Sequence, residues 1–170
     1  MDQIIKPGIR AYFFATILFY LLFSLSSAAQ EMPPKPVSLY FNQNLSFGAF
    51  SPGISGGTVT VNSIGARFAT GSVILVSQGY LYFPAIFELE GNPGTIVHML
   101  GGPDATLVGS NGGSLSLHLG DITPADPIII NVAPPGRLQI RIGGTLTVGG
   151  QMANPPGYYN GYFQVMVIQE

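Results

Sequence analysis

The sequence predicts an all-β protein, an antiparallel β-sandwich of about nine strands. Two observations carry this prediction: apolar and polar residues alternate with a period of two, and groups of glycine and proline separate the alternating stretches at short intervals. No stretch after Gln30 shows the 3.6-residue period of an amphipathic helix. Jelly rolls and small barrels share these features, so the pattern defines the fold class and leaves the topology open.

The alternating stretches are predicted to be half-buried strands, because successive side chains of a strand point to opposite faces of the sheet. Within residues 57–61 two valines share one face and two threonines the other, and within residues 113–119 leucines alternate with polar side chains. The same alternation recurs in residues 138–142, 145–148 and 163–167. From the apolar faces we expect a core that contains Phe47, Phe50, Phe87, Leu115, Leu117, Ile140, Leu146, Phe163, Val165 and Val167.

Turns are predicted where glycine and proline gather, since glycine adopts the positive φ and proline the fixed φ that tight turns need. The chain has 23 glycines and 14 prolines among 170 residues. Their groups separate the alternating stretches at residues 51–53, 56–57, 92–94, 101–103, 111–113, 134–136 and 154–157. Turns this frequent are typical of antiparallel strands joined by short connections.

The first 29 residues have the features of a secretory signal peptide. Lys6 and Arg10 give a basic start, residues 11–25 form an apolar run, and the small residues Ser27 and Ala29 precede the expected cleavage site. An uncleaved membrane anchor is the alternative, but the run is shorter than the ~20 residues that span a bilayer. We therefore expect export through the inner membrane to the periplasm, the cell surface or the extracellular space.

After cleavage we expect a Pro-rich leader over residues 30–36 and a single β-sandwich domain over residues 37–170. The mature chain carries seven acidic and four basic side chains, a formal net charge of −3 with neutral histidines. So few basic residues do not attract a phosphate backbone, and nucleic acid is not an expected partner. No second long apolar segment follows, so no membrane span is expected after signal cleavage.

A series of short glycine-rich and strand-like stretches, among them GGTVTV and GGTLTV, lies at residues 45–50, 56–61, 65–67, 84–87, 91–94, 143–148 and 157–163. In this order they resemble the domain of unknown function 4402 family of secreted bacterial β domains, which is similar to spore coat protein U and to chaperone–usher pilin subunits. The resemblance implies an immunoglobulin-like or pilin-like sandwich that serves as a pilus-like or coat subunit, and it implies no catalytic residue. The related pilins usually carry a disulfide, but this chain has no cysteine.

The residues themselves offer no convincing catalytic set. Ser55 lies in a G-x-S-x-G pattern, but that motif needs a following helix to hold the serine on a strained elbow, and here a strand follows. We therefore expect a turn at Ser55. His98 and His118 have no third ligand at a zinc-like spacing, and alternation places His118 on the solvent face of its strand. No catalytic residue, metal or cofactor is predicted, and we do not expect an enzyme.

The carboxylates are few and mostly isolated. Glu88 and Glu90 share a strand face, whereas Asp104, Asp121 and Asp126 lie in loop-like sequence. Calcium prefers oxygen ligands, so these three aspartates would bind it if their loops converged, although no EF-hand spacing is present. Solvated loops are the simpler expectation.

Tyr158, Tyr159 and Tyr162 cluster around an Asn-Gly pair and form the candidate ligand-stacking site. Aromatic rings of this kind can stack on a sugar, so carbohydrate is a candidate ligand. The family resemblance favours a different role, in which a tyrosine before the last strand packs against the corner of the sheet. Tyr80 and Tyr82 alternate on another predicted strand.

The first predicted strand of the domain raises the question of pairing between copies, because unpaired strand edges recruit partners. Val37, Leu39 and Phe41 alternate as a donor strand requires, and residues 42–44 provide a hinge. These three residues are candidate subunit contacts with another copy or a related surface subunit. The competing expectation, favoured by the short segment and the missing disulfide, is pairing within its own domain.

These observations predict a non-enzymatic, exported structural or adhesive surface protein, such as a pilus-like or coat subunit. Charged residues make up only 8% of the chain against a usual ~25%, which is typical of a protein that presents an uncharged surface. A secreted carbohydrate-binding module that uses the tyrosine cluster is the alternative, and the absence of tryptophan counts against it.

We expect the mature protein to begin at or near Gln30, because Met32, Pro33 and Pro34 would obstruct a later cut while Ala29 fits the small position before one. Intact-mass measurement of the exported protein checks this. Exported protein that still carries residues 1–20 would contradict it.

Overall fold

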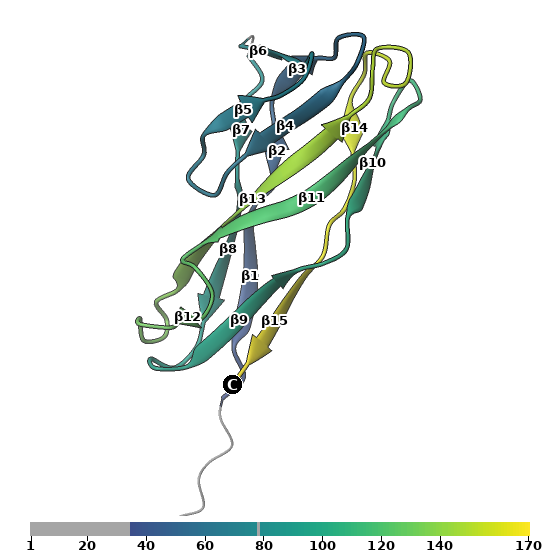
Figure 1. Ribbon diagram of the computed structural model, residues 1–170. Helices are drawn as coiled ribbons and strands as arrows, with labels where there is room; N and C mark the ends of the chain where they lie inside the picture. Colours follow the sequence, from purple (N-terminus) through teal and green to yellow (C-terminus); the bar gives the residue numbers. More distant parts are fainter. Residues whose placement is uncertain (1–34, 78) are drawn as a thin grey trace, which may run out of the picture. The chain divides into compact units, whose positions relative to one another are not determined.

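The computed structural model describes residues 35–77 and 79–170, so the predicted signal peptide and most of the predicted leader lie outside the described residues. The described chain is entirely β, with fifteen short strands, no helix, and antiparallel pairing between every two neighbouring strands (Figure 1). In this part of the chain no helix is long and apolar enough to cross a membrane. The structure confirms the predicted all-β class.

The strands in chain order are β1 (Ser38–Gln43), β2 (Ser46–Phe47), β3 (Ala49–Ser51), β4 (Gly57–Val61), β5 (Arg67–Ala69), β6 (Ile74–Val76), β7 (Tyr82–Phe83), β8 (Ala85–Glu90), β9 (Ile96–Gly101), β10 (Ala105–Gly109), β11 (Ser114–Thr123), β12 (Ile128–Ile129), β13 (Leu138–Val148), β14 (Tyr159–Asn160) and β15 (Val165–Gln169). The sequence predicted about nine. Several of the additional strands have only two or three residues, which is too short to show an alternating pattern.

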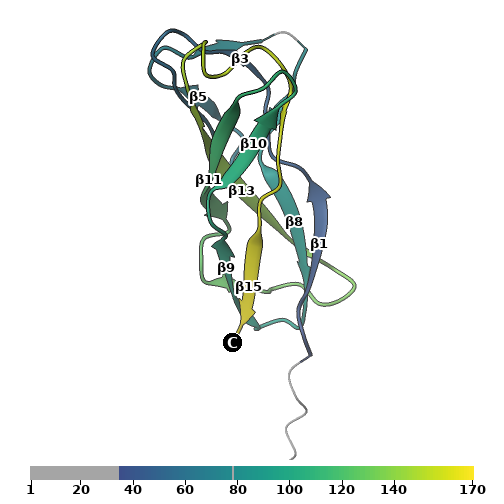
Figure 2. The ribbon, with the colours of Figure 1, turned by 90° about the vertical axis from the view of Figure 1, so that its right-hand side faces the viewer.

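The largest sheet is built around β13. Eight strands belong to it, in the order β1-β8-β13-β11-β10-β14, with β4 pairing to β13 and β5 to β4. Residues 138–142 of β13 pair with β8 and residues 144–148 pair with β4, while β11 pairs along the other edge. Three smaller sheets complete the fold: β12-β9-β15, β2-β7 and β3-β6 (Figures 1 and 2).

Two hydrophobic cores lie between the layers. The lower core, near β9 in Figure 1, contains Ala85, Phe87, Leu89, Val97, Met99, Ile128, Ile130, Ile140 and Ile142. The upper core, near β2 and β4, contains Phe47, Val59, Val61, Val73, Leu115, Leu117, Leu146 and Val148. Both cores use the same face of β13, because Ile140, Ile142, Leu146 and Val148 are all spaced by even numbers of residues.

Two apolar side chains, Leu45 and Phe163, pack against both cores. Leu45 lies where the N-terminal segment passes from β1 of the large sheet to β2 of a smaller one, and Phe163 lies where the C-terminal segment passes from β14 to β15. The chain therefore crosses between layers at both of these points. Figure 2 shows the side of the domain on which β1 and β15 lie.

The predicted core is correct for six of its residues, which are buried: Phe47, Phe87, Leu115, Leu117, Ile140 and Leu146. It is wrong for the other four, which are only partly buried: Phe50, Phe163, Val165 and Val167. Alternation predicted correctly that their side chains face apolar neighbours. These four belong to segments at strand edges, where the sandwich covers an inward-facing side chain incompletely.

We expect Ile140→Ala to destabilise the protein by about 2–5 kcal/mol, because its side chain is fully enclosed and the substitution leaves a cavity. Phe163→Ala should cost less than the roughly 3–5 kcal/mol of a fully enclosed phenylalanine, since water already reaches part of its ring. Urea denaturation of both variants measures the two losses. A Phe163→Ala loss of 4 kcal/mol or more, about the middle of that range, would mean that the ring is enclosed in solution.

Candidate functional site

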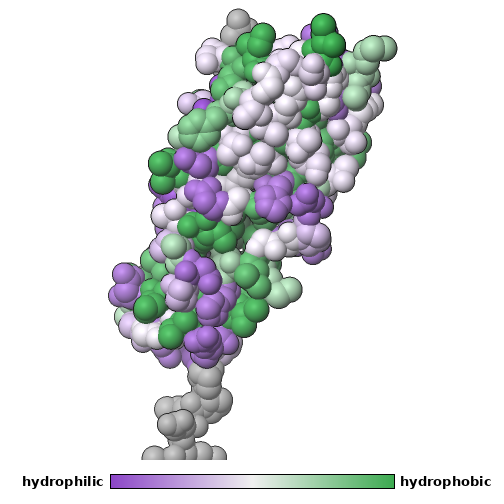
Figure 3. Space-filling view, in the orientation of Figure 1, coloured by the Kyte–Doolittle hydropathy of each residue, from purple (hydrophilic) through white to green (hydrophobic). Residues whose placement is uncertain are grey.

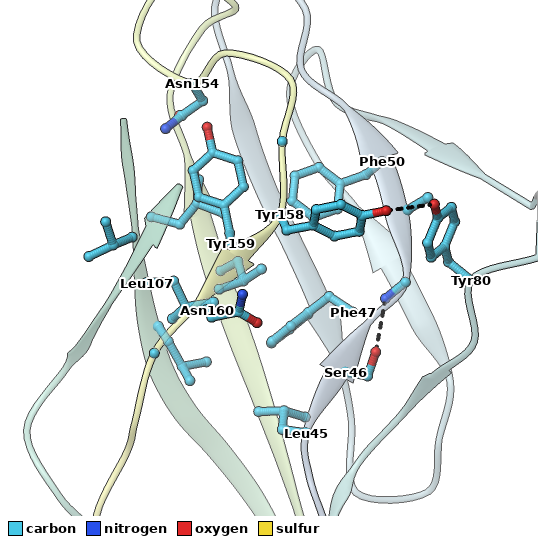
Figure 4. A pocket seen from close by; sticks show the side chains of 18 of the residues that line it. Leu45, Ser46, Phe47, Phe50, Tyr80, Leu107, Asn154, Tyr158, Tyr159 and Asn160 are labelled. Atoms are coloured by element: carbon cyan, nitrogen blue, oxygen red, sulfur yellow. Dashed lines mark hydrogen bonds between the residues drawn. The ribbon is translucent and has the colours of Figure 1, made fainter. Parts of the chain in front are cut away.

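A groove of about 1630 Å³ lies in the upper half of the domain (Figure 4). One wall is formed by residues 44–52, which include β2 and β3, and the other by residues 155–163, which include β14. Leu107 also lines the groove, with Leu115 and Leu146 of the buried upper core beneath. The groove therefore lies where two segments far apart in sequence run along the same side of the sandwich.

The first wall is held in place by Arg67. Its guanidinium donates hydrogen bonds to the backbone carbonyls of Phe47 (3.0 Å), Ala49 (3.3 Å) and Val76 (3.3 Å), and it lies over the ring of Tyr82. One side chain thus fixes β2, β3 and β6 together. Between β2 and β3 the chain turns at Gly48 with φ of +67°, where a Cβ would come within 2.7 Å of the Arg67 guanidinium.

The second wall is anchored to the neighbouring β10–β11 turn. The backbone N–H of Tyr158 donates to the Ser110 hydroxyl (3.1 Å), and the Asn111 side-chain amide donates to the carbonyl of Pro156 (2.6 Å). The Tyr159 hydroxyl donates to the carbonyl of Pro155 (2.8 Å), a hydrogen bond between two residues of the same wall. These bonds hold residues 155–160 against the β10–β11 turn.

The groove is uncharged. None of the described residues that line it is Asp, Glu, Lys, Arg or His, and the polar groups present are hydroxyls, amides and the backbone. On the face shown in Figure 3, strongly hydrophilic residues gather in the middle and lower parts of the domain, and few lie on its upper half. The tyrosine hydroxyls are the only titratable side-chain groups among these described lining residues, and such a groove suits an uncharged occupant.

The walls of the groove end in free strand edges. Within the described chain, β2 pairs only with β7, β3 only with β6 and β14 only with β10. An unpaired edge presents backbone donors and acceptors that another extended chain can use. The groove also exceeds the ~300–1,000 Å³ of usual small-molecule pockets. Its size and its edges both suit an extended polypeptide.

The three predicted stacking tyrosines line the groove but have different surroundings. Tyr162 is almost fully exposed, Tyr159 packs against the upper core, and Tyr158 meets Tyr80 with 3.4 Å between the two hydroxyl oxygens. This hydrogen bond raises the pKa of the Tyr80 hydroxyl above its usual value. Figure 4 shows the Tyr158–Tyr80 contact spanning the two sides of the groove.

The predicted subunit contacts Val37, Leu39 and Phe41 lie on or next to β1, which pairs with β8 of its own domain. Val37 packs against the lower core. Leu39 is opposite Leu89 and Phe41 opposite Phe87, yet 37% of Leu39 and 60% of Phe41 remain exposed. β1 is an edge strand whose apolar face is only partly covered.

The remaining candidate residues are not brought together. Ser55 lies in an exposed turn, as predicted, where its backbone N–H donates to the Ser72 hydroxyl. His118 is exposed, as predicted, and its Nδ1 lies 2.7 Å from Asp104. Asp121 accepts hydrogen bonds from the backbone N–H and the hydroxyl of Ser63.

The other acidic residues have separate partners. Glu88 and Glu90 both accept hydrogen bonds from the Arg137 guanidinium at 3.3 Å, which confirms that they share a strand face. The guanidinium also lies over the Tyr40 ring of β1, 3.6 Å from its centroid. Among the residues that the structure describes, no group of three or more His, Asp or Glu side chains is arranged to hold a metal ion.

His98 bridges two carboxylates at the lower end of the domain. Its Nδ1 lies 2.9 Å from Asp126 and its Nε2 lies 3.1 Å from Glu170, and Asp126 also accepts a hydrogen bond from the Met99 backbone N–H. The hydrogen bond with Asp126, assisted by the one with Glu170, raises the pKa of His98. The same contact lowers the pKa of Asp126. The cluster ties residue 170 and the loop before β12 to β9.

The sequence did not predict the groove. Its walls are separated by about a hundred residues, and neither Tyr80 nor Leu107 carries a motif that points to the other. The one sequence feature that could have indicated the groove is the low charge of the two segments that form its walls. Only the pairing of strands brings these segments together.

The fold and the groove define a class of protein: an all-β sandwich domain with an open, uncharged side. The chain belongs to the family described as Domain of unknown function (DUF4402), which it matches over residues 37–168. Comparisons with curated proteins and with solved structures gave no match.

We expect the contribution of the His98 cluster to stability to depend on pH. Because folding raises the pKa of His98, its contribution is complete below the ordinary value of about 6.5 and is lost as pH rises through the raised value. The melting temperature of the wild type should therefore exceed that of His98→Gln most near pH 6 and least near pH 9. A difference that grows with pH would contradict this assignment.

Proposed function

We propose that this protein is a non-enzymatic, exported structural or adhesive surface subunit that assembles with copies of itself or with related subunits, as in a pilus-like or coat structure. The observation that carries this proposal is the uncharged groove bordered by unpaired strand edges. Unpaired strand edges recruit extended partners, so a groove bordered by them is a candidate interaction site.

The chemistry of the described surface supports assembly over catalysis. None of the described residues that line the groove is His, Asp, Glu, Lys or Arg. The His98 cluster and the His118–Asp104 pair lie elsewhere. Edge strands β1 and β15 add further unpaired backbone beside partly covered apolar side chains. Edges of this kind stabilise contacts between subunits through main-chain hydrogen bonds and apolar packing.

The location proposed follows from the N-terminal sequence. The basic start, the short apolar run and the small residues before Gln30 support export, and the protein would then act in the periplasm, at the cell surface or outside the cell. The resemblance to spore coat and pilin subunits agrees with such a location. Val37, Leu39 and Phe41 are the proposed subunit contacts.

We expect the purified mature protein, residues 30–170, to form concentration-dependent oligomers or filaments. The physical reason is that association covers the groove and the free strand edges. Sedimentation velocity over a wide concentration range, followed by electron microscopy of the largest species, measures this. A protein that stays monomeric at every concentration would contradict the proposed assembly.

A carbohydrate-binding module is the second candidate, and the Tyr80–Tyr158 contact on the groove favours it. Tyrosine rings offer a stacking surface for sugars, and Tyr158 is 66% exposed. Under this function Tyr158→Ala would abolish binding to an oligosaccharide, whereas Tyr40→Ala, which changes a tyrosine on β1 that does not line the groove, would leave it unchanged.

A further inference from the structure

We propose that Tyr80 and Tyr158 form an oxidative modification site, at which a peroxide joins the two rings into a dityrosine. The two hydroxyl oxygens lie 3.4 Å apart, and Figure 4 shows that the contact joins side chains from the two sides of the groove. The inference goes beyond the proposed function, since it assigns a covalent modification within one molecule and does not require assembly.

The two tyrosines are close together and also accessible to an oxidant. Tyr80 is 57% exposed and Tyr158 is 66% exposed, so an oxidant in solution can reach both rings. The two residues are 78 positions apart in the chain, so the fold alone brings them together. Two reacting groups that are held in contact combine far more readily than the same groups on separate molecules.

The backbone on each side of the contact is fixed by hydrogen bonds. The N–H of Tyr158 donates to the Ser110 hydroxyl (3.1 Å), and the carbonyl of Tyr158 accepts from the Ser110 N–H (2.9 Å). On the other side, the Ser46 hydroxyl donates to the carbonyl of Leu81 (2.8 Å), the residue that follows Tyr80. Anchored segments of the chain therefore hold the two rings beside each other.

The other described tyrosines have different surroundings, which makes the proposed pair selective. The rings of Tyr40 and Tyr82 each lie beneath a guanidinium, and the Tyr159 hydroxyl donates to a backbone carbonyl. Tyr162 is almost fully exposed, so its oxidation would lead to cross-links between molecules. Within the part of the chain that the structure describes, no other hydrogen bond joins two tyrosine side chains.

The reaction balances with hydrogen peroxide as the oxidant, acting through a haem peroxidase. Each phenol gives up one electron and its hydroxyl proton, and the two phenoxyl radicals join through a bond between the ring carbons ortho to the hydroxyls. Each of these carbons then loses its hydrogen as a proton, while each oxygen regains one. The protein loses two hydrogen atoms in all, and the peroxide is reduced to two molecules of water.

The product is a covalent cross-link that this chain cannot make with cysteine. The chain has no cysteine, although the proposed location outside the reducing cytosol would permit disulfides. A bond between residues 80 and 158 restricts the unfolded chain over a long loop, and this favours the folded state as a disulfide does. The same bond fixes the distance between the two sides of the groove.

The site is tested by treating the purified mature protein, residues 30–170, with hydrogen peroxide and a haem peroxidase at low protein concentration. We expect a monomeric product that has the blue fluorescence of dityrosine. Trypsin cleaves after arginine, so digestion should release residues 68–137 joined to residues 142–170, lighter by two hydrogen atoms than the sum of the two peptides. The yield of this product should not change with protein concentration.

Four conservative variants identify the two rings. Tyr80→Phe and Tyr158→Phe should each lower the yield of the cross-linked monomer at least about tenfold, because phenylalanine keeps the ring in place but cannot form a phenoxyl radical. Tyr82→Phe and Tyr162→Phe are the matched controls and should leave the yield unchanged. All four side chains are exposed, so the variants should fold as the wild type does.

The melting temperature tests whether the bond stabilises the fold. The cross-linked wild type should melt at a higher temperature than the untreated protein. Peroxide-treated Tyr80→Phe should show no such rise, although its exposed methionines are oxidised equally. A cross-linked monomer that melts no higher than the untreated protein would overturn the stabilising role.

A cross-linked monomer that persists in Tyr80→Phe or Tyr158→Phe would overturn the inference, and so would products that join only separate molecules. These measurements are made on the monomer. Their failure therefore leaves the proposed assembly intact, and a protein that never assembles can still form the cross-link.

Discussion

The fold depends on the pairing and packing of β13. This strand has neighbours on both edges along its length, β11 on one side and β8 followed by β4 on the other, and one of its faces supplies both hydrophobic cores. Where β8 gives way to β4, the strand carries Gly143 and Gly144. A Cβ on Gly144 would lie 2.8 Å from the Leu45 side chain and 3.0 Å from the Leu117 side chain, so the glycine lets these leucines pack closely over β13.

That close packing also determines where the sandwich is open. Leu45 and Phe163 contact both cores at the two crossings between layers, so the segments that carry them run along one side of the domain without a strand between them. Arg67 fixes one segment and the β10–β11 turn fixes the other. The walls of the groove are therefore held from outside, and the Tyr158–Tyr80 side-chain contact crosses it although no strand of the described chain pairs across it.

The chemistry of the domain separates into two regions. Ion pairs lie outside the groove, in the His98 cluster, between Arg137 and the glutamates of β8, and between His118 and Asp104, whereas the groove is uncharged. Charged groups keep the lower half hydrated and give it a dependence on pH. Uncharged walls suit backbone hydrogen bonds and apolar contacts.

The sequence by itself determined the class of fold, the turns and the direction in which most side chains face. Period-two alternation correctly placed Ile140 and Leu146 inward and His118 outward, and the strand after Ser55 correctly indicated a turn at that serine. These features could be predicted because each depends on residues only a few positions away. Only the tertiary structure decided how well each inward face is covered. Phe50 and Phe163 face the interior yet remain partly exposed, and Tyr80 meets Tyr158, because coverage depends on which strands pair across large sequence separations.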